Sequence, residues 1–337
     1  MKHAFIIGGN GHIGRATTHK LIENGWRVTI AGRSIPRVPI FKGAVNYVQF
    51  DRKNSQALKE SLDGTVDFLM DCLSFDETDA EQLVSLSGHV GHICAISSIS
   101  VYADNRGFSL DESYETGSFP DLPVPIKSDH ATVEAGPATY STKKIAMEQK
   151  LRAKAVCPVN ILRPGAIYGP YSKHAREWFF VKRLLDGRKQ IPLAYDGQSR
   201  FHTTSVENIA AAVLASTKGK LPAITNVVDP TAPTVREIAS AIMKALGLEA
   251  EIIGLSEDIF PPKYGRSPWG IPKPFICEHS KNYKPIGAYK DLVGTTVAQL
   301  RDDIDLIHWK DALPQLAWYP VNLFDYDAED KILTKFR

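Results

Sequence analysis

Three glycines close to the N-terminus constrain the fold of this chain more than any other feature. Gly8, Gly11 and Gly14 follow a short apolar run, residues 4–7, and precede a helical pattern at residues 13–24. Glycines at this spacing allow a tight turn, a close approach of the backbone to a pyrophosphate, and close packing of helix against strand. The pattern therefore predicts a strand, a phosphate-binding turn and a helix in direct succession.

Apolar strand patterns alternate with helical patterns through the first half of the chain. Predicted strands occupy residues 4–7, 27–31, 45–49, 66–70, 92–96 and 159–162, and predicted helices occupy residues 13–24, 55–61, 77–86 and 139–153. Strands that alternate with helices form parallel sheets covered by helices on both faces. The predicted fold class is α/β: a doubly wound parallel sheet with a smaller C-terminal α/β lobe.

A change in the sequence pattern after residue 169, from alternating strands and helices to aromatic helical segments, predicts the domain organisation. Residues 1–169 are assigned to a dinucleotide-binding domain, which is rejoined by about 203–217. Residues 170–202 and 218–337 are assigned to a substrate-binding lobe. In that lobe a capping-box pattern, Thr at 234 and Glu at 237, predicts a helix. The active site is expected between the lobes, at the carboxyl ends of the strands.

Composition excludes several classes of protein. The 337 residues are 43% hydrophobic and 23% charged, with a net charge of +2. This near-neutral charge gives no indication of a basic surface that would bind nucleic acid or an anionic membrane. Four cysteines are too few for a disulfide framework, and no metal site is predicted. No apolar run is long enough for a transmembrane helix and no signal peptide is found, so a cytoplasmic location is expected.

The glycine turn and the end of the second predicted strand indicate the cofactor contacts. The amides of His12 and Ile13 should point at a phosphate from the start of the helix, with Asn10 in the turn beside them. NAD sites usually place an acid after the second strand, but this chain has Arg33, followed by Arg37. Because an arginine suits a 2′-phosphate through charge-assisted bonds, the sequence favours NADP over NAD.

A tyrosine and a lysine one helical turn apart indicate the catalytic centre. Tyr140 and Lys144 share one face of a predicted helix. A tyrosine acts as a base only if its pKa, normally about 10, is lowered, and the lysine charge would do so. The hydroxyl of Ser98 would bind and orient the reacting oxygen, with Ser97 and Ser100 as alternatives.

The glycine run, the serine-rich strand end at residues 97–102 and the Tyr140–Lys144 pair occur in an order that resembles the extended short-chain dehydrogenase/reductase family. This family is also called the NAD-dependent epimerase/dehydratase family. The resemblance covers residues 4–250. It implies that Tyr140 acts as the base and that Lys144 also holds the nicotinamide ribose.

The same resemblance implies three further cofactor contacts. Asp51 would contact the adenine, the backbone of Leu73 would contact the cofactor after the fourth strand, and Pro164 would border the nicotinamide. The segment 103–137 is longer than is usual in the family, and we expect it to form a loop near the substrate. Family members often dimerise through the tyrosine-bearing helix, which suggests a homodimer.

Absent residues narrow the expected reaction. Family dehydratases carry an Asp-Glu pair where this chain has Ile99-Ser100, which argues against sugar dehydration. The expectation is an epimerase or oxidoreductase acting on a sugar or nucleotide-sugar hydroxyl or carbonyl. The alternatives are an NADP-dependent reductase of a non-sugar carbonyl and a non-catalytic binding protein. Residues 168–188 resemble a subgroup related to chloroplast stem-loop RNA-binding proteins, but the retained Tyr140 and Lys144 argue against RNA as the ligand.

Overall fold

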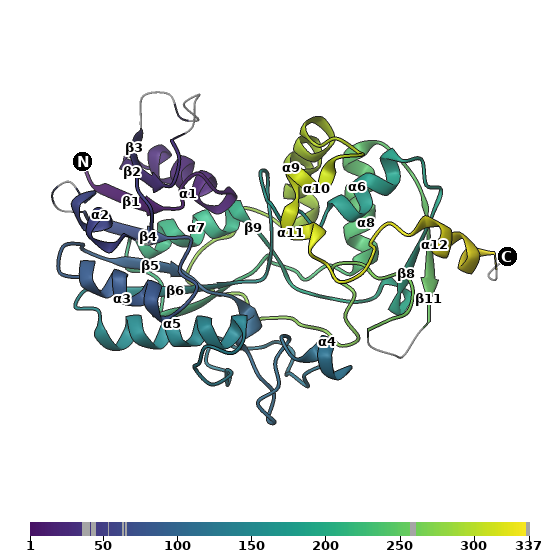
Figure 1. Cartoon of the computed structure of the whole chain (residues 1–337), viewed down its shortest axis with the longest axis horizontal. Coiled ribbons are helices and arrows are strands. Elements are labelled where there is room, and N and C mark those ends of the chain that lie inside the picture. Colours follow the sequence, from purple (N-terminus) through teal and green to yellow (C-terminus); the bar gives the residue numbers. More distant parts are fainter. Residues whose placement is uncertain are drawn as a thin grey trace.

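The large lobe is built on one parallel sheet (Figure 1). The computed structural model describes residues 1–35, 41, 45–52, 54–62, 64, 66–256 and 261–334, so Arg37 lies outside the described residues. Over that part of the chain the sheet has seven strands in the order β10-β6-β5-β4-β1-β2-β3. Its strands are β1 (His3–Ile7), β2 (Arg27–Gly32), β3 (Val45–Gln49), β4 (Phe68–Asp71), β5 (Ile93–Ile96), β6 (Val159–Pro164) and β10 (Ile224–Val227).

Helices cover both faces of this sheet, as the sequence predicts. α1 (His12–Glu23) and α7 (Val206–Ser216) pack on one face, and α2 (Ser55–Glu60), α3 (Glu77–Leu86) and α5 (Tyr140–Lys154) pack on the other. Each face has its own apolar cluster, which includes Leu21 and Val213 on the first side and Leu83 and Met147 on the second. Burial of each large apolar side chain stabilises the fold by about 1.5–3 kcal/mol, and so holds the strand ends in fixed positions. The doubly wound α/β fold class is confirmed.

The end of the returning segment differs from the sequence-based division. The sequence assigned residues 218–337 to the second lobe, but β10 pairs in parallel with β6 and completes the large sheet. Thr225 and Asn226 are buried polar residues in the middle of β10. They interrupt the apolar run that normally indicates a buried strand, and this four-residue strand was therefore missed.

The second lobe packs helices around a separate aromatic core. Its helices are α6 (Trp178–Leu185), α8 (Val235–Leu246), α9 (Tyr289–Asp303), α10 (Trp309–Ala312), α11 (Pro314–Ala317) and α12 (Tyr326–Leu333), of which α8 and α9 are the longest. The predicted capping box of Thr234 and Glu237 starts α8. Trp178, Phe180 and Ile238 are buried in one cluster with residues of α9 and α11.

Two short parallel strand pairs complete the second lobe. β8 (Gln190–Ala194) pairs with β11 (Glu251–Leu255) at its outer end, and β7 (Ala166–Tyr168) pairs with β9 (Thr203–Ser205) where the two lobes join. Because β7 follows β6 directly and β9 leads into α7, this second pair carries the chain from one lobe to the other and back. Within the described residues, no helix is both long and apolar enough to cross a membrane.

Candidate active site

A cavity of about 760 Å³ lies between the lobes, and residues just beyond the carboxyl ends of β1, β5 and β6 line it. This volume is in the range of sites that hold small molecules and cofactors. Most of the predicted site residues line it: Asn10, Gly11, His12, Ile13, Leu73, Ser98, Tyr140, Lys144 and Pro164. The second lobe contributes another set of side chains: Tyr171, His174, Arg176, Gln299 and Gln315. The cavity is therefore closed on one side by the glycine loop and on the other by the second lobe.

The glycine loop has the shape that a pyrophosphate requires. Gly8 has a backbone φ of +78°, which residues other than glycine rarely adopt. A Cβ on Gly14 would lie only 2.4 Å from the Cα of Gly9, so this position also requires glycine. Gly11 is the N-cap of α1 and provides no side-chain cap. The first-turn amides of α1, which lack intrahelical partners, therefore face the cavity and can bind an anion.

Three predicted cofactor residues lie at the edge of this loop or beyond the cavity lining. Asn10 Nδ2 donates a hydrogen bond to the Ser34 carbonyl oxygen at 3.0 Å and so joins the glycine loop to the end of β2. Arg33 and Asp51 are exposed and are not part of the cavity lining. They follow β2 and β3, the two strands beyond β1 at that side of the sheet.

Ser98 is the serine that contacts the candidate base. Its side chain lies close enough to that of Tyr140 to favour the ionised phenol, and its Oγ accepts a bond from the Ser100 amide at 3.1 Å. The hydroxyls of the two alternative serines form hydrogen bonds with other side chains. Ser97 Oγ donates to Glu148 Oε1 at 2.5 Å, and the Ser100 hydroxyl accepts a bond from Ser141 at 3.0 Å. Of the three serines, Ser98 has the geometry of an oxygen anchor.

Tyr140 begins α5 with its phenol in the cleft. Although 45% of the residue is exposed, burial of the phenol raises its pKa to about 12. The nearby Ser98 hydroxyl opposes this rise in pKa, the negative charge of Asp111 adds to it, and the Arg176 charge opposes it. The pKa of Tyr140 thus lies above its usual value, which differs from the expectation of a lowered pKa, because burial of the phenol outweighs the opposing influences. The Lys144 ammonium lies over the ring, 5.6 Å from its centroid.

Lys144 is a buried cation held by backbone carbonyls. The residue is 2% exposed. Its Nζ donates to the Ile96 carbonyl oxygen at 2.9 Å and also to the Ser74 carbonyl oxygen, so the ammonium is tied to the ends of β4 and β5. Burial lowers its pKa to about 8, and the negative charge of Asp71 opposes this shift.

Replacement of Lys144 by methionine should make the protein more stable at neutral pH. The lysine binds its proton less tightly in the folded state, with a pKa of about 8 against 10.5 when unfolded. The destabilisation is full below pH 8 and disappears as the pH rises to 10.5. We expect Lys144→Met to gain about 1–3 kcal/mol at pH 7, after allowance for the lost hydrogen bonds.

Urea unfolding of the native protein and of Lys144→Met across this pH range checks the prediction. The difference in unfolding free energy should shrink between pH 8 and 10.5. Lys143→Met is the matched control, because the neighbouring lysine is exposed. A difference that stays constant with pH would show that the lysine does not titrate in this way.

The sequence did not predict an ion-pair network at the end of β4. Arg52 Nη1 lies 2.6 Å from Asp71 Oδ2, and its Nε donates to Asp79 Oδ1 at 2.7 Å. Asp71 also accepts a hydrogen bond from the Leu73 amide at 2.7 Å. That amide is therefore engaged within the protein, which argues against a cofactor contact from the amide of Leu73, although the residue does line the cavity.

A second buried ion pair lies beneath the catalytic residues and was also missed. Arg163 donates to Glu148 through two nitrogens, Nε at 3.0 Å and Nη2 at 2.6 Å. The residues are 3% and 2% exposed and join β6 to α5. Because the same glutamate accepts from Ser97, the pair also fixes the strand end that carries Ser98.

The long segment 103–137 supports α5 rather than the cavity wall. Within the described part of the chain, the cavity lining includes none of its residues, which differs from the expectation of a loop near the substrate. Asp111 instead accepts a hydrogen bond from the Ser141 amide at 2.7 Å. The segment thus provides a carboxylate at the N-terminus of the tyrosine-bearing helix, where a negative charge is favourable.

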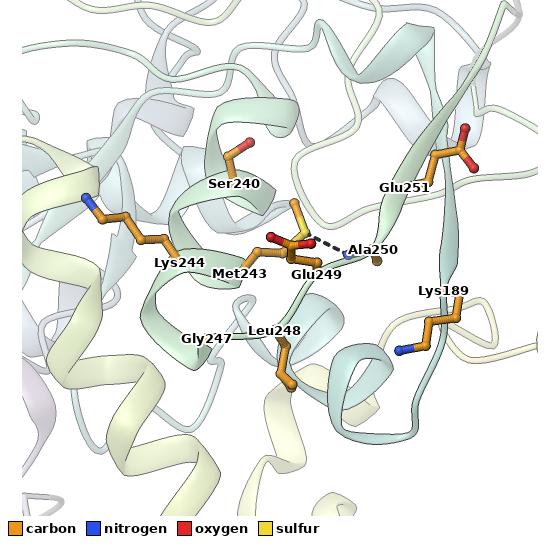
Figure 2. A pocket seen from close by; sticks show the side chains of 9 residues that line it. All are labelled: Lys189, Ser240, Met243, Lys244, Gly247, Leu248, Glu249, Ala250 and Glu251. Atoms are coloured by element: carbon orange, nitrogen blue, oxygen red, sulfur yellow. Dashed lines mark hydrogen bonds between the residues drawn. The ribbon is translucent and has the colours of Figure 1, made fainter.

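A separate depression of about 940 Å³ lies on the second lobe, between the end of α8 and β11 (Figure 2). Its charged side chains, which include Lys189, Lys244 and Glu251, are spread around the rim and do not converge on one point. The Ala250 amide donates to the Met243 sulfur at 3.3 Å. This depression has none of the glycine-loop or catalytic residues, and so the cleft between the lobes remains the candidate site.

The fold and the glycine-lined cleft define a dinucleotide-binding α/β protein. The model of the NAD dependent epimerase/dehydratase family matches residues 4–227. Since the match covers more than half of the 337 residues, the chain belongs to that family.

Solved structures agree on the fold. UDP-glucose 4-epimerase from Thermotoga maritima is 15% identical, with a TM-score of 0.65 over 89% of this chain and 98% of that one. dTDP-glucose 4,6-dehydratase from Bacillus anthracis, in complex with NAD, is 15% identical, with a TM-score of 0.66 over 93% and 100%. UDP-N-acetylglucosamine 4-epimerase from Bacillus cereus is 18% identical, with a TM-score of 0.66 over 91% and 99%. No curated protein sequence matches the chain.

Proposed function

We propose that this protein is an NAD(P)-dependent epimerase or oxidoreductase that acts on a hydroxyl or carbonyl of a sugar or nucleotide sugar. One observation carries the proposal: Ser98 and Tyr140 lie side by side in the cavity that the glycine loop also lines. A candidate proton-transfer group and a candidate phosphate-binding turn thus line the same cavity. The structural neighbours named for nucleotide-sugar enzymes support the substrate class.

The chain's own residues would divide the work as follows. A bound nicotinamide supplies hydride acceptance and return. Tyr140 would take the proton of the substrate hydroxyl, which requires that the positive charge of a bound oxidised nicotinamide lowers the raised pKa of its phenol. Ser98 would hold the same oxygen through its hydroxyl. Lys144 would contribute positive charge and bind the nicotinamide ribose, while Pro164 and Leu73 would border the ring. The residues of the second lobe would bind the rest of the substrate.

Incubation with nucleotide sugars tests this function. UDP-glucose, UDP-N-acetylglucosamine and dTDP-glucose would each be mixed with the protein and each dinucleotide, and the sugar would be followed by proton NMR. An epimerase gives a new sugar isomer with no net change in nicotinamide absorbance, whereas an oxidoreductase changes that absorbance. If no sugar is converted and the absorbance is constant with every pair, the proposal fails.

The preference for NADP rests on Arg33. Arg33→Ala should weaken binding of NADP and NADPH by about tenfold or more, because a charge-assisted bond to the 2′-phosphate is lost, and should leave NAD and NADH unchanged. Isothermal titration calorimetry measures the four affinities. Arg27→Ala is the matched control, since Arg27 is also exposed but begins the same strand at the opposite end. If NADP and NADPH bind equally well to the native protein and to Arg33→Ala, Arg33 does not contact the 2′-phosphate and the preference for NADP is contradicted.

Three finer hypotheses accompany the proposal. The first is that the protein is an NADP-dependent reductase of a non-sugar carbonyl. The second is that it is a non-catalytic protein of this fold that binds a dinucleotide or RNA, as the resemblance of residues 168–188 to chloroplast stem-loop RNA-binding proteins suggests. A gel-shift assay with structured RNA separates that second case. A homodimer through α5 is the third hypothesis, and light scattering on the purified protein tests it.

A further inference from the structure

A segment of the second lobe, residues 171–176, lies across the glycine loop. The guanidinium of Arg15 stacks on the ring of Tyr171, 4.1 Å from its centroid, and its Nε donates to the Asn10 carbonyl oxygen at 2.9 Å. The Tyr171 amide donates to Gln299 Oε1 at 3.2 Å. These contacts hold the segment between α9 and the N-terminus of α1, so the side chains that follow Tyr171 face the glycine loop across the cavity.

Arg176 ends this segment with an unsatisfied guanidinium. It lines the cavity, and its Nε is buried with no hydrogen-bond partner among the described residues. The residue as a whole is only partly buried, but a buried polar atom such as this Nε is normally paired. An arginine that faces a cavity without a partner therefore indicates that its partner is a ligand.

The groups around Arg176 are neutral imidazoles rather than carboxylates. His12, the first residue of α1, and His174 both line the cavity with it. Burial lowers the pKa of His12 to about 4, and the Arg176 charge adds to that shift. Burial also lowers the pKa of His174 to about 2, and the charges of Arg176 and then of His12 add to that shift. The guanidinium is thus close to the start of α1.

The adjacent acid does not neutralise this charge. Glu177 is 1% exposed, and its Oε1 accepts a hydrogen bond from the Tyr289 hydroxyl at 3.2 Å. Burial raises its pKa to about 7, although Arg176 opposes that shift. Over the described residues, no carboxylate lies within ion-pair distance of Arg176. The cluster therefore carries uncompensated positive charge opposite helix amides that also favour an anion.

We propose that Arg176 binds a phosphate group of the ligand in the cleft, opposite the first turn of α1. The inference rests on the proposed function, because it requires a phosphate-bearing ligand. A planar guanidinium can hold two phosphate oxygens at once, while the α1 amides hold the others. The phosphate belongs either to the dinucleotide or to a nucleotide-sugar substrate, and in both cases it joins the two lobes across the cavity.

Calorimetric titration of Arg176→Gln tests the inference without an activity readout. The probes are NAD, UDP and inorganic pyrophosphate, measured separately on the native protein and on the variant. Loss of a charge-assisted contact should weaken the affected probe by about tenfold or more. Arg176→Lys, which keeps the charge but not the fork, should give a smaller loss. Lys310→Gln is the control for net charge, because Lys310 is exposed on α10.

Each outcome decides something. Weaker NAD binding with unchanged UDP binding assigns the phosphate to the cofactor, and the reverse assigns it to the substrate. Equal affinities for every probe in Arg176→Gln and Lys310→Gln overturn the inference, as does failure of all three probes to bind the native protein. If NAD does not bind but UDP or pyrophosphate does, and Arg176→Gln weakens it, the inference holds while the proposed function fails.

Discussion

Replacement of Tyr140 by phenylalanine should reduce turnover by about 10²–10⁴-fold, the usual contribution of a positioned proton-transfer group. The ring still fills its place at the start of α5, but the hydroxyl beside Ser98, which would exchange the proton, is gone. Dinucleotide affinity should change little, because the glycine loop and α1 are untouched. Steady-state rates with the best substrate from the nucleotide-sugar assay, together with calorimetric affinities, measure both effects.

The matched control is Tyr264→Phe, which removes a tyrosine hydroxyl from the part of the chain between β11 and α9, outside the cavity lining. It should keep native turnover. A Tyr140→Phe protein that turns over as fast as the native enzyme would remove Tyr140 from the mechanism. Equal losses in both variants would point to a general effect of tyrosine removal on folding.

Replacement of Arg163 by methionine should lower the free energy of unfolding by about 3–5 kcal/mol, because it leaves Glu148 as a buried charge without a partner. The two residues are 3% and 2% exposed and share two hydrogen bonds. Urea unfolding followed by circular dichroism gives the difference. The effect should be larger than for most single substitutions, because it combines a lost pair with an uncompensated charge.

The double variant Glu148→Met with Arg163→Met separates the ion pair from simple loss of packing. Since apolar replacements of a whole buried pair are often neutral, the double variant should recover most of the lost stability. If Arg163→Met alone costs less than about 1 kcal/mol, the pair behaves like an exposed salt bridge, and the account of how α5 is joined to β6 is wrong.

Local sequence patterns were sufficient for the fold and for part of the site. The glycine loop and the strands β1 to β6 each depend on residues that are neighbours in the sequence, and the parallel sheet follows from their alternation with helices. The placement of Ser98 and Tyr140 in one cavity was anticipated from two motifs whose places after a strand and at a helix start were predictable. In such cases short-range rules decide the geometry.

The remainder depends on tertiary packing between distant residues. Arg163 and Glu148 are ordinary surface residue types by sequence, and only the packing of α5 against β6 buries them together. Arg52 meets Asp71 for a similar reason. Arg176 lies in a segment without a recognisable motif, and its role emerges only because the second lobe brings it opposite α1.

The central claim is that the cleft binds a nicotinamide dinucleotide beside Tyr140. Equilibrium titration of the purified protein with NAD, NADH, NADP and NADPH tests that claim most directly. We expect saturable binding of at least one of the two cofactor pairs, NAD with NADH or NADP with NADPH, at one site per chain. If none of the four binds, the glycine loop and its cavity serve another ligand, and the enzymatic account is contradicted.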